Sequence, residues 1–558
     1  MKQTSLIEGN IFSSLVRFAL PVLFTLFLQA LYGAVDLLVV GQFAQTADVS
    51  GVATGSMLLQ TVTGLIIGLS MGITVLVGKK IGEGNSREAG RAVGIGICIF
   101  AVFAAVLMAF LVFGAGLLSR VMQAPEEAFS QTVSYVRICG FGIVFIVGYN
   151  VFGSIFRGIG DSKTPMVTVI IACFVNIAFD LLFVAVFGMG AEGAALATVL
   201  SQGISVAASL LIIRKKQLPF ELTRADLRFD KGLILTELKL GVPIALQDLL
   251  VGISFLIIQM VVNTMGVTAS AGVGVAEKIC VFIMLVPSAY MQSMSAFVAQ
   301  NMGAGKSHRA DRALWYGIIT AVIIGILMGY AAFFHGDIMG TVFSKDAAVI
   351  AASHQYLKAY AIDCALTPFL FCFIGYFNGC ERTLFVMLQG IIGAFGIRVP
   401  VVFLMSSLPG TNLFHIGLAT PCSTVVQITM CLIMYRYIRK KRKVQEELKE
   451  TLFAEVKTKV QQFITTAEYD EYLCRRINEA VKFAGDDEIQ IYLSSSDKSK
   501  ANDLAQKTGT PLQVSKEDFI GGIRAEIPHK NILIDNSFSA NLASMCREFK
   551  FDGGLKNE

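Results

Sequence analysis

Apolar segments long enough to cross a lipid bilayer recur along most of this chain. A hydrocarbon core about 30 Å thick requires roughly 20 helical residues. Segments of that length cover residues 15–40, 52–77, 92–118, 131–156, 166–187, 192–213, 241–264, 272–297, 314–334, 353–377, 385–407 and 413–436. The pattern predicts an all-α polytopic membrane protein with about twelve transmembrane helices.

The distribution of charge indicates a domain boundary near the end of the last apolar segment. Only 16% of the 558 residues are charged, but the charges are unevenly placed. Residues 1–443 hold 31 Lys and Arg against 21 Asp and Glu, whereas residues 444–558 hold 15 against 20. A basic membrane region followed by an acidic segment predicts a separate C-terminal domain outside the membrane.

Basic residues in the short loops predict the orientation of the chain. Met1–Asn10 has no charged and apolar pattern of a removable signal peptide, so we expect none. Alternate loops are rich in Lys and Arg, whereas the opposite loops hold little beyond Arg120 and Lys345. The positive-inside rule then places both termini in the cytoplasm of a bacterial or archaeal cell, with the helices in its inner membrane.

The two halves of the membrane region repeat each other with a shift of about 221 residues. The matching blocks are RFALPVLF at Arg17 with KLGVPIAL at Lys239, GKKIGEGNSREAGRAV at Gly78 with AQNMGAGKSHRADRAL at Ala299, and IFRGIGDSKTPM at Ile155 with YFNGCERTLFVM at Tyr376. Because each half holds an even number of helices, the two copies are parallel repeats. We therefore expect an N-lobe (1–213), a cytosolic linker (214–240), a C-lobe (241–443) and a cytosolic domain (444–558), with a cleft between the lobes.

Four polar residues at similar depth form a candidate ion site in the N-lobe. Asp36 lies inside an apolar span, where an ionisable side chain is costly unless it faces a partner or a cavity. Asn176 and Asp180 are four residues apart on one helix face. Asp180 and Thr198 each lie eight residues from the turn at residues 188–190, which is about 12 Å of helix.

Two carboxylates, an amide oxygen and a hydroxyl suit Na⁺, and two neighbouring carboxylates also suit a proton. The repeat places Ile258, Ile397 and Val401 at the positions equivalent to Asp36, Asn176 and Asp180, so the set belongs to the N-lobe alone. The alternative is that each residue pairs separately with a neighbouring helix for packing. Either Na⁺ or H⁺ is the expected coupling ion, with no other cofactor.

Other residues are weaker candidates for a substrate cleft or for gating. Pro21 removes a backbone hydrogen bond from the first helix and allows that helix to bend. Gln29 and Tyr32 precede Asp36 on the same helix. In the C-lobe, Asp248 and Asp363 are intramembrane acids for which structural and substrate-facing roles stay equally open. The chain has no GxxxxGK[ST] motif and no catalytic constellation, so we expect no enzyme.

Several motifs together resemble the multidrug and toxic compound extrusion (MATE) family of secondary transporters. They are VDLLVVGQF, the GKKIGEGN loop and its second copy, FRGIGDSKTPM, and NIAFDLLFVAVFGMGAEGAALATVLSQ. The resemblance covers about residues 10–440 and implies an antiporter with two six-helix lobes that exports cationic amphipathic drugs in exchange for Na⁺ or H⁺. It also places the cation site of the family on Asp36, Asn176, Asp180 and Thr198.

The C-terminal segment is expected to form a small α/β domain. Residues 444–464 are typical of a charged amphipathic helix, and EIQIYL at Glu488 is typical of a strand. The stretch from Ile520 has the pattern of a hairpin that runs into a helix. The FIGGI and ILIDNSFSANL segments resemble the C-terminal domain of the peripheral-stalk E-subunit of V-type and archaeal-type rotary ATPases, which implies an ATPase-stalk-like partner.

The sequence as a whole predicts a multidrug efflux antiporter that works by alternating access. Its expected partners are small cationic amphipathic molecules and the lipid bilayer, with no nucleic acid. One alternative is a lipid-linked saccharide flippase of the same superfamily, which would need a basic cleft to hold pyrophosphate. Another is a membrane anchor for a rotary ATPase stalk, which would not need the acidic cluster of the N-lobe.

Overall fold

A computed structural model gives the structure of residues 6–216, 218–220, 222–223 and 226–549. Parts of the predicted N-terminal start (1–10), of the inter-lobe linker (214–240) and of the C-terminal domain (444–558) therefore lie outside the described residues. The chain forms two compact units, Met1–Leu432 and Ile433–Glu558.

The first unit consists of long helices joined by short turns. Its α-helices are α1 (Ile11–Phe43), α2 (Thr46–Gly82), α3 (Ser86–Val121), α4 (Phe129–Phe141), α5 (Ile143–Gly158), α6 (Lys163–Asp180), α7 (Gly190–Lys215), α8 (Lys231–Asn263), α9 (Val267–Ile283), α10 (Leu285–Gly303), α11 (Ser307–Thr341), α12 (Ala347–Gly379), α13 (Thr383–Ile391), α14 (Val399–Ser406), α15 (Leu413–Gly417) and the start of α16 (Ala419–Ile464). A 3₁₀ turn, η1 (Glu126–Ala128), precedes α4, and π-helical stretches η2 (Leu181–Val186) and η4 (Ile392–Arg398) follow α6 and α13.

The number of membrane-spanning helices agrees with the sequence pattern. Within the described residues, ten helices are long and apolar enough to cross a membrane, or up to twelve if each of two bent pairs is one span. The bent pairs are Glu126–Phe141 with Ile143–Gly158 and Val267–Ile283 with Leu285–Gly303, at 54° and 40°. The prediction of a mostly helical membrane protein with about twelve spans is confirmed.

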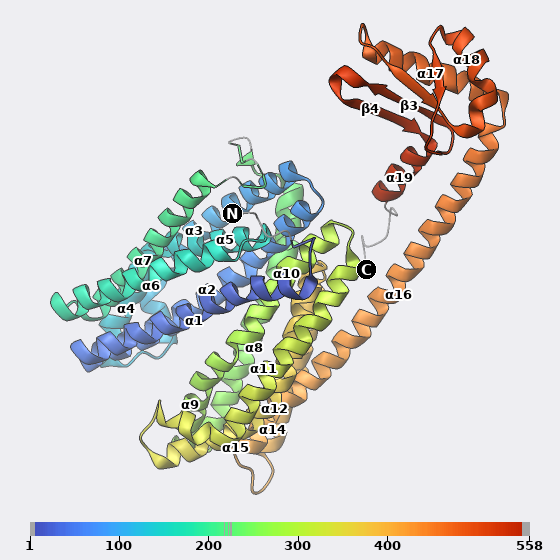
Figure 1. Cartoon of the computed structure of the whole chain (residues 1–558). Helices are drawn as coiled ribbons and strands as arrows, with labels where there is room; N and C mark the ends of the chain where they lie inside the picture. Colours follow the sequence, from blue (N-terminus) through green and yellow to red (C-terminus); the bar gives the residue numbers. More distant parts are fainter. Residues whose placement is uncertain (1–5, 217, 221, 224–225, 550–558) are drawn as a thin grey trace. The chain divides into compact units, whose positions relative to one another are not determined.

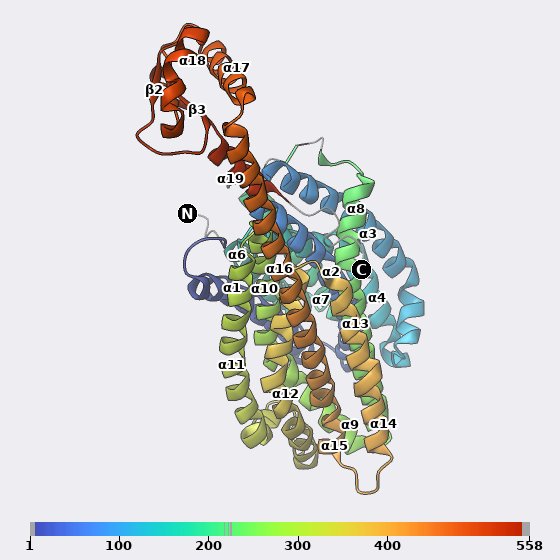
Figure 2. The ribbon, with the colours of Figure 1, turned by 90° about the vertical axis from the view of Figure 1, so that its right-hand side faces the viewer.

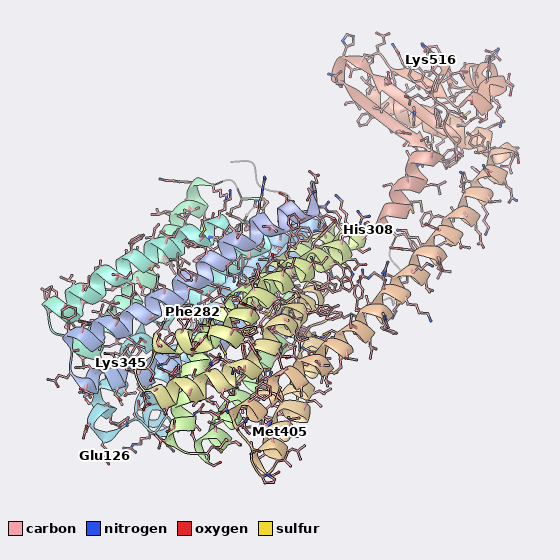
Figure 3. The ribbon with its side chains drawn as sticks, turned by 60° about the horizontal axis from the view of Figure 1, so that its bottom comes forward. Glu126, Phe282, His308, Lys345, Met405 and Lys516 are labelled. Carbon is pink, nitrogen blue, oxygen red and sulfur yellow. The ribbon has the colours of Figure 1, made fainter. Side chains whose placement is uncertain are left out.

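The two copies of the repeated loop lie at one end of this unit, which we call the basic end and define by the turns at residues 83–85 and 304–306. His308 lies at this end in Figure 3, and Glu126, Lys345 and Met405 lie toward the opposite end. The helices of the two lobes converge at the basic end and separate toward the opposite end (Figures 1 and 2). The lobes are therefore held together mainly at the basic end.

A close backbone contact joins the two lobes at the basic end. A Cβ atom on Gly82, at the end of α2, would lie 2.0 Å from the main-chain oxygen of Gln300. A Cβ atom on Gly303, at the end of α10, would lie 2.1 Å from the main-chain oxygen of Lys79. The repeat relates these two contacts to each other, because the shift of 221 residues carries the first pair onto the second. An ion pair of 2.6 Å between Lys79 and Glu381 adds to this junction.

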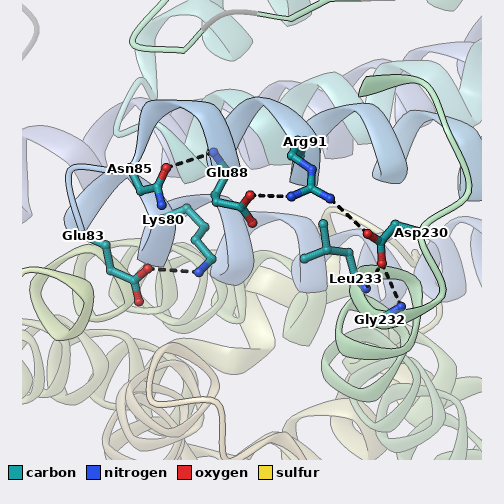
Figure 4. A network of polar contacts seen from close by, with 8 residues as sticks. All are labelled: Lys80, Glu83, Asn85, Glu88, Arg91, Asp230, Gly232 and Leu233. Carbon is teal, nitrogen blue, oxygen red and sulfur yellow. Dashed lines mark hydrogen bonds and ion pairs between the residues drawn. The ribbon is translucent and has the colours of Figure 1, made fainter. Parts of the chain in front are cut away.

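The polar residues of the first repeated loop fix the start of α3 (Figure 4). The Asn85 side chain accepts a hydrogen bond of 3.1 Å from the backbone N–H of Glu88, which caps the helix. Arg91, one turn later, pairs with both Glu88 and Asp230 at 2.6 and 3.0 Å. Asp230 is itself the N-cap of α8 in the second lobe. The loop is therefore a capped turn, and Arg91 ties α3 to the beginning of the C-lobe.

The second unit is a small domain with its own sheet and core. It contains the end of α16, then α17 (Ala467–Ala484), β1 (Gln490–Leu493), η5 (Ser495–Lys500), α18 (Ala501–Thr508), β2 (Leu512–Val514), β3 (Gly522–Ile527), η6 (Pro528–Lys530), β4 (Ile532–Ser537) and α19 (Phe538–Glu548). The strand order is β2-β1-β3-β4. Strand β1 pairs parallel with β2 and antiparallel with β3, and β3 and β4 form the expected hairpin.

The core of this domain lies between α17 and the sheet. It includes the fully buried side chains of Tyr469, Leu473, Ile491 and Ile523. The predicted α/β character of the domain is confirmed, and the amphipathic helix expected at 444–464 continues without a break from the last membrane span in α16. The resemblance of this domain to the ATPase E-subunit stays a prediction.

Candidate functional site

One face of α1 carries three polar residues, Gln29, Tyr32 and Asp36. Their spacings of three and four residues place them on the same side of the helix. Gln29 donates a hydrogen bond of 2.6 Å to the hydroxyl of Tyr149 on α5. Because helix faces inside a membrane protein are otherwise apolar, this stripe marks the side of α1 that faces polar partners in the N-lobe.

Two parallel hydrogen bonds connect this stripe to α7. Thr198 Oγ1 lies 3.3 Å from Asp36 Oδ2, which accepts the hydrogen bond, and Gln202 Nε2 donates to the Tyr32 hydroxyl at 3.2 Å. The two donors are four residues apart on α7, and the two acceptors are four residues apart on α1. Since the helices run in opposite directions, the pairs form successive rungs between the same two helix faces.

The third wall of the cluster comes from the end of α6. The side chains of Asn176 and Asp180 are 1% and 0% exposed, and Asp36 is 6% exposed. Asp36 lies close enough to Asp180 and Asn176 for their side chains to affect its carboxylate electrostatically, and Thr198 forms a hydrogen bond with it. Directly after Asp180 the chain becomes the π-helix η2, a local change of winding that often accompanies functional sites. The structure thus brings together all four residues of the predicted ion site.

Several oxygen atoms in this cluster are buried without a hydrogen-bond partner. They are Asp36 Oδ1, Asn176 Oδ1 and both carboxylate oxygens of Asp180. Buried polar atoms normally have partners, and an unpaired buried carboxylate is especially costly. Two carboxylates beside an amide oxygen form a donor set that fits a hard monovalent cation or one or two protons. The arrangement therefore fits the Na⁺ or H⁺ expected from the sequence, although the ion itself stays a prediction.

A cavity lies within the N-lobe and includes Gln29, about two turns before Asp36, in its wall. The space inside it that a water-sized molecule can occupy is about 30 Å³. Its walls come from four N-lobe helices and from Gln292 on α10 of the C-lobe; the lining residues are Val22, Thr25, Leu26, Gln29, Ile67, Tyr149, Asn150, Gly153, Arg157, Ser162, Pro165, Thr168, Val169 and Gln292. At least half of these side chains are polar, and a site for a small organic molecule would require this space to widen.

Pro21, the predicted bending point, lies inside α1 beside this cavity. It deprives the helix of one backbone donor. Its carbonyl oxygen accepts a hydrogen bond of 2.7 Å from the Thr25 hydroxyl, a contact that often bends helices. Thr25 and Val22 both line the cavity. A change in the bend of α1 at Pro21 would therefore alter the shape of the cavity wall.

The two acids of the C-lobe lie apart from this cluster and differ from each other. Asp248 is exposed on α8. Asp363 on α12 is 1% exposed and accepts a hydrogen bond of 2.6 Å from Thr367. The buried Arg398 donates to Ser254 Oγ at 2.9 Å, and its guanidinium lies 4.4 Å from the ring centre of Phe255. A substrate role for Asp248 and Asp363 stays a prediction.

Comparison with known proteins assigns both halves of the membrane region to one family. The sequence model of the MatE family matches residues 21–182 and again 243–404, once for each half of the repeat. The chain is 28% identical over 447 residues to the probable multidrug resistance protein YpnP of Bacillus subtilis. The matched region covers 79% of this chain and 98% of that protein. It is 24% identical over 418 residues to the probable multidrug resistance protein NorM of Thermotoga maritima, over 72% of this chain and 86% of that protein.

Solved structures show the same fold. A crystal structure of MATE in complex with MaD3S has a TM-score of 0.74 and 20% sequence identity, covering 79% of this chain and 99% of that one. An outward-facing multidrug resistance MATE family transporter of the MOP superfamily gives the same TM-score, identity and coverage. With a family model that matches both halves of the membrane region, this chain belongs to the MatE family, and the resemblance found in its sequence motifs is confirmed.

Proposed function

We propose that the protein is a secondary active efflux transporter that exports cationic amphipathic molecules in exchange for Na⁺ or H⁺. The observation that carries this proposal is the cluster of buried oxygen atoms around Asp36 and Asp180, which have no hydrogen-bond partners in the described part of the chain. The names of the relatives, which include multidrug resistance and multidrug export proteins, support the direction and the substrate class.

In the proposed cycle the ion enters the cluster formed by Asp36, Asn176, Asp180 and Thr198. Asp36 belongs to α1, whereas its partners belong to α6 and α7, so an ion shared among them pulls the three helices together. Pro21 lies about four turns before Asp36 on the same helix, and the α1 residues that line the cavity lie about two to four turns before it. Ion binding therefore changes the position of α1 and weakens binding of the substrate in the cavity.

The membrane arrangement follows from the charge of the loops. We propose that the basic end faces the cytoplasm of a bacterial or archaeal cell, so that both termini are cytoplasmic. Because the lobes are joined at this end, the structure corresponds to the state that is closed toward the cytoplasm. Opening toward the cytoplasm then requires the contacts of Gly82 and Gly303 to separate.

Transport by the purified chain in proteoliposomes tests the proposal directly. Ethidium movement is followed by fluorescence under a Na⁺ gradient or a H⁺ gradient, each imposed separately. We expect efflux to be driven by one of the two gradients and to be lost in Asp36→Asn and in Asp180→Asn, because each substitution removes a charge from the cluster. Asp337→Asn, at an exposed position of α11, is the matched control and should transport normally.

Two results would contradict the proposal. Gradient-driven efflux that is unchanged in both cluster variants would remove the ion site from the mechanism. Absence of efflux under either gradient, from protein with a sharp thermal unfolding transition, would exclude ethidium-type cations as substrates. Where the cluster variants lose efflux, normal transport by the Asp337→Asn control separates a specific loss from a general effect of removing an acidic side chain.

A further inference from the structure

A short segment that leads into α1 lies between the two lobes at the basic end. We call residues 6–9 the lead segment. The side chain of Leu6 is only 1% exposed, although it precedes the first helix. A Cβ atom on Gly160, at the turn between α5 and α6, would lie 3.4 Å from Leu6 Cγ. The apolar side chain of Leu6 therefore packs against the N-lobe.

The backbone of the lead segment is bound by an arginine of the C-lobe. Arg309, in the first turn of α11, donates a hydrogen bond of 2.8 Å from Nη1 to the backbone oxygen of Gly9. Its Nη2 atom donates to the backbone oxygens of Glu8 and Leu6 at 3.0 and 3.3 Å. One guanidinium group thus binds three carbonyl groups of the same short segment, and each of these hydrogen bonds has a charged donor.

Two further residues of the C-lobe bind the lead segment. Lys306 Nζ donates a hydrogen bond of 2.9 Å to the backbone oxygen of Ile7. Asn301, which is 0% exposed, donates to the backbone oxygen of Leu6 at 3.2 Å and accepts from Arg309 Nε at 3.1 Å. All four carbonyl groups of the lead segment therefore accept hydrogen bonds from the C-lobe, while the side chain of Leu6 packs on the N-lobe.

These contacts require one particular backbone conformation. Gly9 has a φ of +71°, in the left-handed region that glycine adopts more readily than other residues. This turn directs the carbonyl groups on both sides of it toward the same guanidinium. A lead segment that is extended or detached would lose these hydrogen bonds together, so the contacts form or break as a unit.

The repeat contains an equivalent connection in the opposite direction. Arg91 on α3 pairs with Asp230, the residue that precedes α8 of the C-lobe (Figure 4). A shift of 221 residues carries Gly9 onto Asp230, and it also carries the first residue of α3 onto the first residue of α11. Each lobe thus binds the residues that lead into the first helix of the other lobe. The contacts of the lead segment are therefore half of a reciprocal interface.

We propose that the lead segment is a latch, which holds the lobes together at the basic end and must leave the C-lobe before the protein opens at that end. When the lobes separate there, Leu6 cannot keep both its packing on Gly160 and its hydrogen bonds to the C-lobe. The latch thus stabilises the closed state alone. Weakening it shifts the equilibrium toward the state that is open at the basic end.

This inference rests on the proposed function in one respect, since it takes separation of the lobes at the basic end to be a step of transport. The closed state can be measured without a substrate or an ion gradient, which keeps the two failures distinguishable. Absence of ethidium efflux from the wild-type chain would contradict the proposed function and would not alter this measurement. A failure of the latch variants described next would contradict the latch and would leave the ion-coupled efflux of the wild type in place.

The ion pair between Lys79 and Glu381 reports whether the basic end is closed. It joins the two lobes at 2.6 Å, and its side chains are 33% and 31% exposed. A water-soluble carbodiimide links such an amine and carboxylate as an amide only while they are in contact. The pair of Lys80 and Glu83, at 3.0 Å within the N-lobe, reacts in either state and is the internal reference. Mass spectrometry of the full chain in phosphatidylcholine nanodiscs gives the ratio of the two products.

Three variants weaken the latch in different ways. Leu6→Ala removes the packing on the N-lobe, and Arg309→Gln removes the guanidinium that binds three carbonyl groups. Gly9→Ala strains the turn without a steric clash, because nothing among the described residues lies within 4 Å of the new atom. We expect each variant to lower the ratio of the Lys79–Glu381 product to the reference by about twofold or more.

Matched controls make the same exchanges away from the latch. They are Leu20→Ala, exposed on α1, Arg137→Gln, exposed on α4, and Gly410→Ala, at a φ of +77°. Each control should keep the wild-type ratio. An unchanged ratio in the latch variants would overturn the proposal. An equal fall in the controls would overturn it as well, because the effect would then be a general loss of stability.

Milder variants keep the proposal falsifiable if a latch variant does not fold, which loss of both products would reveal. Arg309→Lys retains the charge without the fork of donors, and Leu6→Val shortens the apolar side chain. Both should lower the ratio by less than the larger changes while the Lys80–Glu83 product stays constant. A wild-type ratio in both of these folded variants would overturn the latch.

Discussion

Thr198 on α7 donates a hydrogen bond of 3.3 Å to the carboxylate of Asp36 on α1, and this contact links the two helices at the level of the candidate ion site. Thr198→Val removes the hydroxyl and keeps the shape of the side chain. We expect the apparent affinity for the coupling ion to fall by about three- to tenfold, since one oxygen ligand and one hydrogen bond are lost. The dependence of ethidium efflux on ion concentration in proteoliposomes measures this apparent affinity.

Ser201→Ala is the matched control on the same helix. The Ser201 hydroxyl donates to the backbone oxygen of Thr198 and not to a side chain of the cluster. The ion dependence should therefore stay as in the wild type. An equal change in both variants would assign the effect to the stability of α7 and not to the ion site.

Gly82→Ala tests the junction of the two lobes. A Cβ atom at this position would lie 2.0 Å from a backbone oxygen, which no side chain rotation can relieve. We expect overpacking to lower the free energy of unfolding by about 1–3 kcal/mol. Gly64→Ala on the same helix has nothing within 4 Å of the new atom and should be neutral or slightly stabilising. Thermal unfolding of both purified variants provides the comparison, and equal transitions would contradict the close contact.

Glu237 on α8 is buried between the lobes, and within the described residues its carboxylate has no partner. Its side chain is 2% exposed, both carboxylate oxygens lack hydrogen bonds, and its neighbours in a small apolar cavity include Leu69 and Phe100. Glu237→Met keeps a similar volume and removes the polar group, so we expect the free energy of unfolding to rise by about 1–3 kcal/mol. Thermal unfolding measures the change, with the exposed Glu127→Met as control. A destabilised Glu237→Met would show that the carboxylate has a partner in the folded protein.

Asp161 provides a prediction for the dependence of stability on pH. Burial alone would raise the pKa of Asp161, but the hydrogen bonds from Lys216 and Thr164 lower it overall. A folded-state pKa below the ordinary value of about 3.9 stabilises the protein above that pH, and the stabilisation disappears as the pH falls through the lowered pKa. The difference in melting temperature between the wild type and Asp161→Asn should thus be constant near neutral pH and shrink below about pH 4. A difference that grows on acidification would contradict the assignment.

The C-terminal domain is expected to be dispensable for transport. Its buried residues, including Tyr469 and Leu473, pack on its own sheet and form a separate hydrophobic core. Deletion of residues 444–558 should therefore leave ion-driven ethidium efflux in place, whereas the isolated segment should show a cooperative unfolding transition. Complete loss of efflux in a normally inserted truncated chain would show that the domain takes part in the transport cycle.

The sequence predicts the membrane spans and the acidic cluster because both depend on strong local signals. A long run of apolar residues has few structural alternatives to a membrane-spanning helix. An acidic residue inside such a run, such as Asp36 or Asp180, stands out against its apolar neighbours. Gln202 and Tyr149, which complete the polar stripe of α1, are neutral residues whose pairing depends on how the helices are rotated. The spacing of four residues between Thr198 and Gln202 was the available signal for one of them.

Other features depend on context that the sequence does not contain. Arg157 follows a span and precedes a basic loop, so by composition it counts among the loop residues that set the orientation, whereas in the structure it lines the cavity. Strand β2 has only three residues after Pro511, too few to show an alternating pattern, and forms only because β1 offers it a parallel edge. The bend between α4 and α5 falls at Gly142 and the bend between α9 and α10 falls three residues before Pro287, and a glycine or a proline inside an apolar segment does not by itself predict a bend of a given size.

The reciprocal contacts at the basic end bear on how such a chain could have arisen. Gly82 meets the backbone of Gln300, and Gly303 meets the backbone of Lys79, which the repeat places in the position equivalent to Gln300. Each half therefore carries both the glycine and the carbonyl that the other half needs. A single six-helix protein with these residues would be complementary to itself, and two copies would associate as a two-fold symmetric homodimer. Duplication and fusion of such a protein would preserve the interface while freeing one half to keep the acidic cluster and the other to lose it.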